Sequence, residues 1–279
     1  MAQQPMAAGT WDEDPAGASL LLATGRPRHD LLVVAEPALL TELDEAWGRP
    51  ASTVRLSFLP GVSAPGTPGQ EDQLRSYDRD GLGVLVARGR TSLMEGKPAR
   101  RVTGLARIAA GAGVRAALLV TRAATLADAA PGTFLPVADH LNLTGAPFFP
   151  ASGMVDTSWD EALALRLGEI DGVGSPAVIA LLPGPVRPTR AETAWLASTW
   201  AEAVVTDTVA EAAALSSRGV RVAGLALVDS RAGAGAPGGA RRPGRRAAAP
   251  AADDGETVSV RRPELVVADA IEAVLAALR

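Results

Sequence analysis

The chain has 279 residues, of which 47% are hydrophobic and 21% are charged, and its formal net charge is −4. This composition is typical of a globular protein with a large core, and the weak negative charge excludes a general attraction to nucleic acid or to anionic membranes. The sequence has no cysteine and two histidines, which excludes disulfides, thiolate metal sites and a cysteine nucleophile, so we expect no metal site.

The N-terminal sequence MAQQPMAAGTWDEDP lacks both the basic and the apolar region of a secretion signal. The apolar run LLVVAEPALL, which begins at Leu31, is far too short to span a bilayer. We therefore predict a cytoplasmic protein without a membrane partner. We expect residues 1–28 to form a flexible N-terminal segment and residues 29–279 to form one domain.

Short β-rich runs bounded by turn residues recur along the chain, and several are apolar on both faces. They are DLLVVA from Asp30, STVRLSFL from Ser52, GVLVAR from Gly83, RAALLVT from Arg115, PAVIALLPG from Pro176, AEAVVT from Ala201 and VRVAGLALV from Val220. Between them lie helical patterns over residues 102–112, 160–169, 189–200 and 209–218. This alternation is expected of a sheet that helices cover on both faces, so the sequence predicts an α/β fold.

The motif DHLNLTG, which we expect at the end of a strand, places Asp139, His140 and Asn142 within four positions. Such residues have the chemistry of a catalytic or metal site. They can equally close a turn at the end of a strand, where their side chains satisfy backbone groups. The motif alone leaves both interpretations open.

Two predicted helices begin with capping boxes. In a capping box the hydroxyl of the first residue accepts from the backbone amide three residues on, and the carboxylate of that later residue accepts from the backbone amide of the first. These boxes pair Ser158 with Glu161 and Thr189 with Glu192. We therefore expect helices to begin directly after Ser158 and Thr189.

The C-terminal part of the chain contains a segment of low complexity followed by a helix. Residues 231–256 offer almost no core-forming side chains and are rich in Pro and Gly, so we expect a mobile insertion. Its arginine cluster has the chemistry to contact RNA or phosphate but is more typical of a solvated loop, and we predict no nucleic-acid partner. Residues 264–278 form an amphipathic helix that should dock on the domain through Val267, Ile271, Val274, Leu275 and Leu278.

Three stretches resemble the trimeric purine nucleoside phosphorylases in order and spacing: GRTSLMEGK from Gly89, DHLNLTG from Asp139 and DTVAEAAALSSRGVRVAGLALV from Asp207. The resemblance covers roughly residues 31–228 and the terminal helix. It implies a three-layer α/β/α domain with a mixed central sheet that assembles as a trimer or hexamer. It also implies transfer of the ribosyl group of a purine nucleoside to phosphate, with phosphate as co-substrate and no other cofactor.

The resemblance assigns phosphate-binding positions to Glu36, Arg90 and Ser92, of which only the arginine matches the family. The family's Gly-Ser-Gly loop corresponds to AEP at residues 35–37, so a carboxylate replaces a hydroxyl and proline removes an amide donor. Ser92 and Met94 replace a histidine and a tyrosine. We expect Glu36 either to pair with Arg90 as a built-in substitute for phosphate or to face solvent.

The positions that the family uses for the sugar and the base are also replaced. Pro188 stands where the family has the glutamate that binds the base. The family's asparagine, which donates to the leaving base, corresponds to Ser230, or to Asp229 if the register slips by one. A Met-Ser pair beside the sugar becomes Thr206 and Asp207. The sugar- and base-binding candidates are Met94, Ala124, Pro188, Thr206 and Ser230, and the catalytic candidates are Asp207, Asp229 and Ser230.

Loss of several transition-state contacts, each worth about 10²–10³ in rate, predicts a phosphorylase-like protein that is impaired in phosphorolysis. Since DHLNLTG is intact, Asp139, His140 and Asn142 are interpreted as turn and subunit-interface residues. Two alternatives remain. One is a non-catalytic subunit that assembles with an active paralogue. The other is an enzyme re-purposed for another nucleoside or nucleophile, in which Asp207 or Asp229 contacts the base or sugar and Glu36 polarises water.

Overall fold

A mixed β-sheet of nine strands occupies the centre of the described part of the chain. The structure, a computed structural model, describes residues 14, 16–145, 158–184, 188–233 and 261–279. The strands are β1 (Leu31–Val34), β2 (Ser52–Val54), β3 (Leu74–Arg79), β4 (Leu82–Ala87), β5 (Ala116–Thr125), β6 (Phe134–Asn142), β7 (Ala177–Leu181), β8 (Ala201–Val205) and β9 (Arg221–Arg231). Their order is β2-β3-β4-β1-β5-β8-β7-β6-β9, and β9 also pairs with β5. Strands β5, β8, β7, β6 and β9 therefore close on themselves, next to an open half of the sheet.

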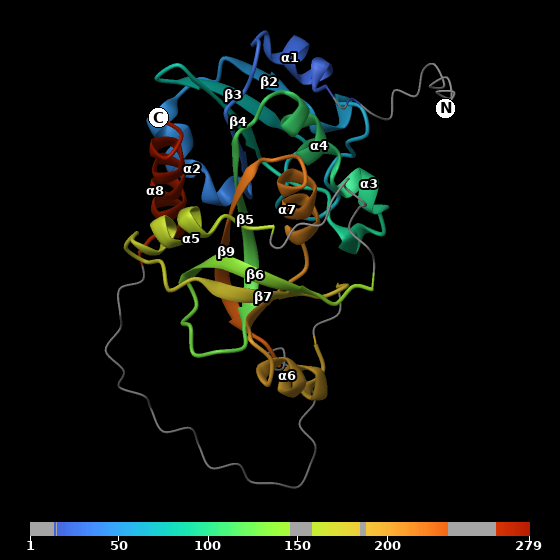
Figure 1. Cartoon of the computed structure of the whole chain (residues 1–279), viewed down its shortest axis with the longest axis vertical. Helices are drawn as coiled ribbons and strands as arrows, with labels where there is room; N and C mark the ends of the chain where they lie inside the picture. The colour runs from blue at the N-terminus through green and yellow to red at the C-terminus, as the bar shows by residue number, and fades with distance from the viewer. Residues whose placement is uncertain (1–13, 15, 146–157, 185–187, 234–260) are drawn as a thin grey trace, which may run out of the picture.

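Helices cover the sheet in two layers (Figure 1). The helices are α1 (Ala18–Thr24), α2 (Thr41–Trp47), α3 (Ala99–Val102), α4 (Gly104–Gly111), α5 (Glu161–Gly168), α6 (Arg190–Ala197), α7 (Val209–Ser216) and α8 (Pro263–Ala276). One apolar cluster joins the sheet to α1, α4 and α7, and a second joins it to α2, α5 and α8. The predicted α/β fold with three layers and a mixed sheet is confirmed.

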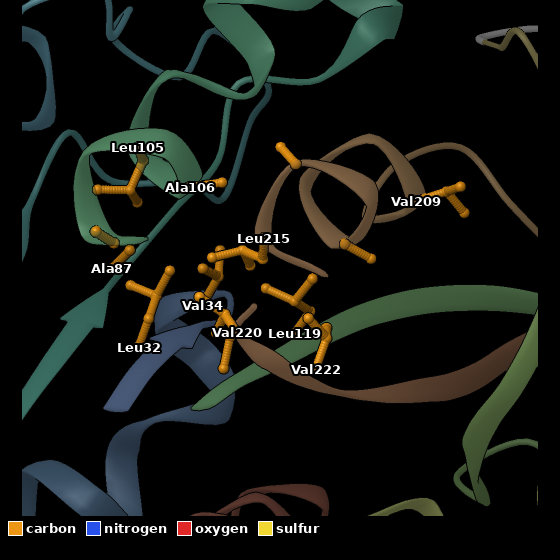
Figure 2. Close-up of a cluster of buried hydrophobic side chains, with 14 of the residues drawn as sticks. Leu32, Val34, Ala87, Leu105, Ala106, Leu119, Val209, Leu215, Val220 and Val222 are labelled. Carbon is orange, nitrogen blue, oxygen red and sulfur yellow. The ribbon is translucent and has the colours of Figure 1, made fainter. Parts of the chain in front are cut away.

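Strand β1 shows why its sequence is apolar throughout. Successive side chains of a strand point to opposite faces. Leu32 and Val34 pack in the cluster beneath α4 and α7, which Figure 2 shows, whereas Leu31 and Val33 pack in the cluster beneath α2 and α8. The first strand is therefore buried on both faces, and its parallel neighbours β4 and β5 bring their carboxyl ends to the same edge.

The N-terminal helix α1 corrects part of the expectation that residues 1–28 are flexible. Residues 1–13 lie outside the described residues, but Leu20 of α1 is fully buried in the core. Gly17, with φ 66°, precedes the helix, and a Cβ at this position would lie 2.4 Å from the backbone nitrogen of Ala112. Only glycine allows this approach to α4 without strain. The segment is ordered because it contributes a leucine to the core.

Two other expectations about local structure need correction. The helix α5 begins after Asp160, whose side chain accepts from the amide of Leu163 at 2.9 Å, and not after Ser158. The reason is that Asp160 donates its backbone amide to the carbonyl of Val222 on β9, so the chain is still extended there. The predicted strand from Ser52 ends at Val54 and continues as a 3₁₀ turn.

The remaining helix predictions hold. Thr189 and Glu192 form the predicted capping box at the start of α6, and α8 docks on the sheet through buried Val267, Ile271 and Val274. The expected mobile insertion lies outside the described residues from residue 234 onward. No helix in the described ranges is long and apolar enough to cross a membrane.

Candidate functional site

Two adjoining cavities form one cleft at the carboxyl edge of β1 and β4. The first cavity, of about 410 Å³, is bounded by residues that follow β1, β4 and β8 and by the middle of β5. The second, of about 180 Å³, is bounded by β5, the end of β8 and the end of β9. Arg122 and Thr206 line both cavities. Ligands of α/β proteins commonly bind outside the carboxyl ends of parallel strands, so this cleft is the candidate site.

The cleft brings together the residues that the sequence assigned to phosphate, sugar and base. Those of the first cavity are Glu36, Arg90, Ser92, Met94, Thr206 and Asp207. Those of the second are Ala124, Pro188, Thr206, Asp229 and Ser230. Asp139, His140 and Asn142 are not among the lining residues of either cavity.

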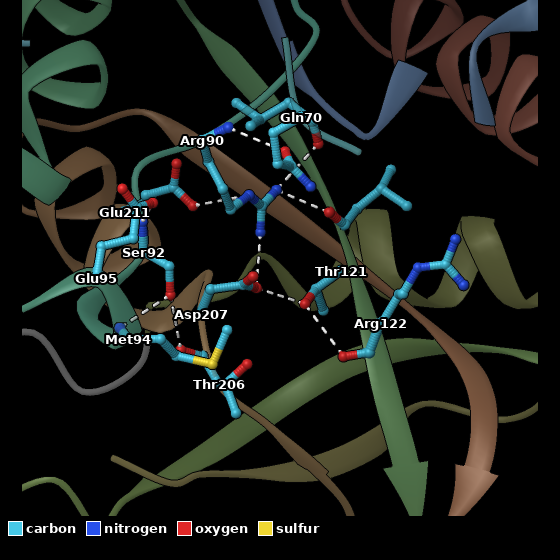
Figure 3. A network of polar contacts seen from close by, with 12 residues as sticks. Gln70, Arg90, Ser92, Met94, Glu95, Thr121, Arg122, Thr206, Asp207 and Glu211 are labelled. Carbon is cyan, nitrogen blue, oxygen red and sulfur yellow. Dashed lines mark hydrogen bonds and ion pairs between the residues drawn. The ribbon is translucent and has the colours of Figure 1, made fainter. Parts of the chain in front are cut away.

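Arg90 is buried, with 6% of its surface exposed, and each of its three side-chain nitrogens faces a protein oxygen (Figure 3). One terminal nitrogen donates to the carbonyls of Val34 on β1 and Val120 on β5, at 3.1 and 2.7 Å. The other donates to Asp207 Oδ1 at 2.9 Å. The Nε atom lies 3.5 Å from Glu211 Oε2 on α7. Arg90 therefore joins β1, β5, α7 and the end of β8.

Asp207 is the carboxylate that pairs with this arginine. It is the second residue after β8, and its Oδ1 accepts from both Arg90 and the hydroxyl of Thr121 on β5. Its side chain is 22% exposed and lines the first cavity. The next residue, Thr208, has φ 73°, a backbone conformation that is strained for a residue other than glycine. Its buried hydroxyl has no hydrogen-bond partner among the described residues.

The expected pair between Glu36 and Arg90 does not form. Glu36 Oε2 instead lies 2.8 Å from both Nε and a terminal nitrogen of Arg122. Arg122 occupies a position at which the resemblance places asparagine, and its longer side chain extends from β5 to the acid. Glu36 is not a solvated acid either, because its side chain is 25% exposed and lines the first cavity. The carboxylate that pairs with Arg90 belongs to Asp207, which is 117 residues away from Arg90 in the sequence.

Glu211 is a second buried acid behind Arg90. Its side chain is 5% exposed, and within the part of the chain that the structure describes its Oε2 has no hydrogen-bond partner, although the guanidinium group lies 3.5 Å away. Burial raises the pKa of Glu211 to about 7, an effect that Arg90 opposes and Asp207 reinforces. An acid of this kind is protonated in the folded protein at pH values where it is ionised in the unfolded chain.

We expect this acid to make stability depend on pH. Between pH 4.5, its ordinary pKa, and about 7, Glu211 binds more protons in the folded than in the unfolded state, so stability falls as pH rises. Between pH 4.5 and pH 8 the free energy of unfolding of Glu211→Gln should therefore rise by up to about 3 kcal/mol relative to that of the wild type. Urea unfolding at several pH values measures this, with the exposed Glu169→Gln as control. Parallel pH profiles of wild type and Glu211→Gln would contradict the assignment.

The Ser92 hydroxyl takes part in local structure. It accepts from the amide of Met94 at 3.2 Å, and the amide of Ser92 donates to the carboxylate of Glu95 at 2.9 Å. These two bonds make a capping box for a short 3₁₀ helix. The hydroxyl also donates to the carbonyl of Thr206 at 3.4 Å. Ser92 therefore fixes the loop against the residue before Asp207, and its side chain already has protein partners on both sides.

The second cavity is mainly apolar, with a polar edge at the end of β9. Ala124, Leu182 and Val204 contribute apolar surface, and Pro188 offers no side-chain donor or acceptor. At the polar edge the hydroxyl of Ser230 donates to Asp229 Oδ1 at 2.7 Å. Arg122 and Arg231 also line this cavity, so it can take a flat ring whose faces are apolar and whose edges carry polar groups.

The DHLNLTG motif forms the end of β6 and the turn after it. Asn142 Oδ1 accepts from the amide and hydroxyl of Thr144, at 3.1 and 2.7 Å, and Asp139 accepts from the amide of His140 at 2.8 Å. The indole of Trp159 donates to His140 Nδ1 at 3.1 Å. Burial lowers the pKa of His140, which keeps the ring neutral and able to accept this bond. These contacts fit a role in closing the turn.

Sequence reasoning does not identify Thr121 or Glu211 as site residues, and it gives Arg122 no role although the resemblance places an asparagine at that position. A signal exists for two of them. Glu211 is the only charged residue in the α7 sequence VAEAAALS, and Arg122 is a long cation directly after an apolar strand core. Buried charges are rare unless they are paired, so a charge on an otherwise apolar face indicates a partner in the fold. Thr121 offers no such signal.

Comparison with known proteins gives consistent relatives. No family model matches the chain. The purine nucleoside phosphorylase of Mycobacterium tuberculosis (strain ATCC 25618 / H37Rv) is 33% identical over 210 residues, which cover 74% of this chain and 77% of that protein. The purine nucleoside phosphorylase of Cellulomonas sp is 30% identical over 223 residues, which cover 74% of this chain and 76% of that protein.

Solved structures agree with these relatives at the level of the fold. The purine nucleoside phosphorylase from Schistosoma mansoni in complex with acetate matches with a TM-score of 0.72 at 18% identity, and the match covers 94% of each chain. A structure of the phosphorylase from the same organism in a complex with BCX-34 matches with a TM-score of 0.67, covering 78% of this chain and 86% of that chain. At such identity the likeness shows the fold alone.

Proposed function

The chain belongs to the purine nucleoside phosphorylase family, and we propose that it is a member whose phosphate subsite is closed by its own Asp207, so that phosphorolysis is impaired. The observation that carries this proposal is the 2.9 Å pair between Asp207 and Arg90. Arg90 corresponds to the arginine that binds phosphate in the family. Each nitrogen of its side chain faces a protein oxygen. Phosphate could therefore bind Arg90 only by displacing the carboxylate of Asp207, which belongs to the same chain.

Charge around the cleft acts in the same direction. Three cleft carboxylates, from Glu36, Asp207 and Asp229, lie within 4 Å of two guanidinium groups of the described residues, those of Arg90 and Arg122, and Arg90 also faces the buried Glu211. Two unit charges of like sign about 4 Å apart repel by about 4 kcal/mol at an effective dielectric constant of about 20. A phosphate dianion beside Asp207 would meet this repulsion and lose its strongest donor. The cleft is therefore unsuited to phosphate.

The base side lacks the groups that the family reaction uses. Pro188 stands where the resemblance places a carboxylate that binds the purine, and the Ser230 hydroxyl donates to Asp229 within the protein. Negative charge that builds on a departing purine would find fewer donors and acceptors than in the family pattern. The apolar second cavity still suits a purine ring. We therefore propose a protein that accepts a purine nucleoside but transfers its ribosyl group to phosphate poorly.

The test is an activity assay of the purified protein with inosine, guanosine and adenosine, each with and without phosphate. We expect formation of ribose 1-phosphate at a rate far below 10 per second, which is about the median turnover of enzymes. Turnover near that value, dependent on phosphate, would contradict the proposal.

We further propose that the protein is a cytoplasmic homo-oligomer, a trimer or a hexamer, with Asp139, His140 and Asn142 near the subunit interface. Family membership supports this assembly. Light scattering at micromolar concentration should give three or six times the mass of one chain, and a clean monomer would contradict it. A non-catalytic subunit that assembles with an active paralogue would instead form mixed oligomers when the two chains are co-expressed.

A further inference from the structure

Asp207 has one bound and one unbound carboxylate oxygen. In the described part of the chain its side-chain hydrogen bonds go to Oδ1, from Arg90 and Thr121, which leaves Oδ2 without a protein donor. The side chain is 22% exposed and lines the cavity of about 410 Å³. Its orientation is fixed by the hydrogen bonds from Arg90 and Thr121. The structure thus presents an oriented acceptor to water at the position where the family holds phosphate.

We propose that the cleft hydrolyses a purine nucleoside, with Asp207 Oδ2 as general base for a water molecule that takes the place of phosphate. This inference rests on the proposed function, because it requires that phosphate is excluded by Asp207. The inference goes beyond the proposed function because it names the nucleophile, water, and the residue that activates it, Asp207.

The reaction balances without any co-reactant other than water. The water oxygen forms a bond to C1′ of the ribose, and the bond between C1′ and the purine nitrogen breaks. The carboxylate of Asp207 takes one proton of the water and later returns it to solvent. The purine nitrogen keeps the electron pair of the broken bond and takes up a proton from solvent. The products are free ribose and the purine base.

The charge of Asp207 also suits the transition state of this reaction. Cleavage of a glycosidic bond passes through an oxocarbenium-like sugar, whose positive charge a neighbouring carboxylate stabilises. Thr206 and Met94, which the resemblance places beside the sugar, line the same cavity as Asp207. The carboxylate therefore lies on the sugar side of the cleft.

The other acids of the cleft are less suited to this role. Glu36 is bonded to two nitrogens of Arg122. Glu211 is 5% exposed and lies behind Arg90, away from water. Asp229 accepts from Ser230 and lines the second cavity instead of the first. Glu36 and Asp207 both line the larger cavity and each keeps one oxygen without a donor among the described residues, but Asp207 is held by the buried Arg90 and by Thr121, whereas Glu36 is held by an arginine that is 44% exposed.

The experiment measures free ribose and ribose 1-phosphate separately, with inosine, guanosine and adenosine in phosphate-free buffer and again with phosphate added. We expect free ribose in both buffers at the same rate. Asp207→Asn, which keeps the shape but cannot take a proton, should lower ribose release by about 100-fold or more. Asp207→Ser should lower it similarly, which guards against a folding defect of one variant, and Glu169→Gln on the surface should leave it unchanged. Circular dichroism of each variant checks the fold.

The outcomes separate the two proposals. Free ribose that disappears in both Asp207 variants supports the hydrolytic role. No ribose from any of the three nucleosides, or ribose release unaffected by Asp207→Asn, overturns hydrolysis by Asp207 but leaves the closed phosphate subsite standing. Rapid formation of ribose 1-phosphate by the wild type overturns both.

Discussion

Replacing Asp207 by serine is expected to tighten binding of inorganic phosphate by on the order of 10²-fold, or about 2.7 kcal/mol. The change removes a negative charge from the anion position and frees an N–H of Arg90, which now donates to Asp207 at 2.9 Å. Serine also supplies the hydroxyl that the resemblance places at this position. The full repulsion between two charges about 4 Å apart would be about 4 kcal/mol, and partial solvent access to the cavity reduces it. Calorimetric titration with phosphate and with sulfate measures the gain.

A matched control is available in the same cavity. Glu36→Ser removes the same charge and leaves the same hydroxyl, but Glu36 is bonded to Arg122 and not to Arg90. We therefore expect Glu36→Ser to tighten phosphate binding by less than about tenfold, since Arg90 stays paired with Asp207 in this variant. If Glu36→Ser gains as much as Asp207→Ser, or if the wild type already binds phosphate as tightly as both, Asp207 does not close the site.

The sequence predicts the framework of the fold because the strands that are buried on both faces carry continuous apolar runs. LLVV of β1 and AALLV at the start of β5 are examples. Strand β6 has no continuous apolar run, because its second half is polar and partly exposed and because it contains Pro136. Strand β3 has no such run because four of its six residues, in the sequence LRSYDR, are polar or charged. A signal for β3 was nevertheless present, since Asp80 and Gly81, both with positive φ, form the turn to β4 that this dipeptide favours.

The sequence predicts the members of the site but not their pairing. Motifs placed Glu36, Arg90 and Asp207 in one cleft, and the structure has all three in the first cavity. Which acid pairs with Arg90 depends on the course of the backbone after β8 and on the length of the Arg122 side chain. These are tertiary properties, because Arg90 and Asp207 are 117 residues apart in the chain. An electrostatic argument from sequence therefore identified a competitor for phosphate but assigned it to the wrong residue.

Replacing Arg90 by methionine is expected to lower the free energy of unfolding by about 3–5 kcal/mol, because removal of one partner leaves buried acids without their cation. Asp207 and Glu211 would lose their guanidinium group, and the carbonyls of Val34 and Val120 would lose a donor. Domains of this kind are stable by only about 5–15 kcal/mol, so the loss is a large part of the total. Urea unfolding at pH 5 and pH 8 measures it.

The control for this loss is Arg221→Met, which also removes an arginine bonded to an aspartate, with Nε of Arg221 2.7 Å from Asp160. The side chain of Arg221 is 41% exposed whereas that of Arg90 is 5% exposed, so the control should cost about 1 kcal/mol or less. The cost of Arg90→Met should also be larger at pH 8 than at pH 5. Burial raises the pKa of Glu211 to about 7, so this acid is protonated in the fold at pH 5 and requires the cation only when it ionises at higher pH. Equal losses in the two variants, or a loss that does not grow with pH, would mean that Arg90 does not compensate the buried acids.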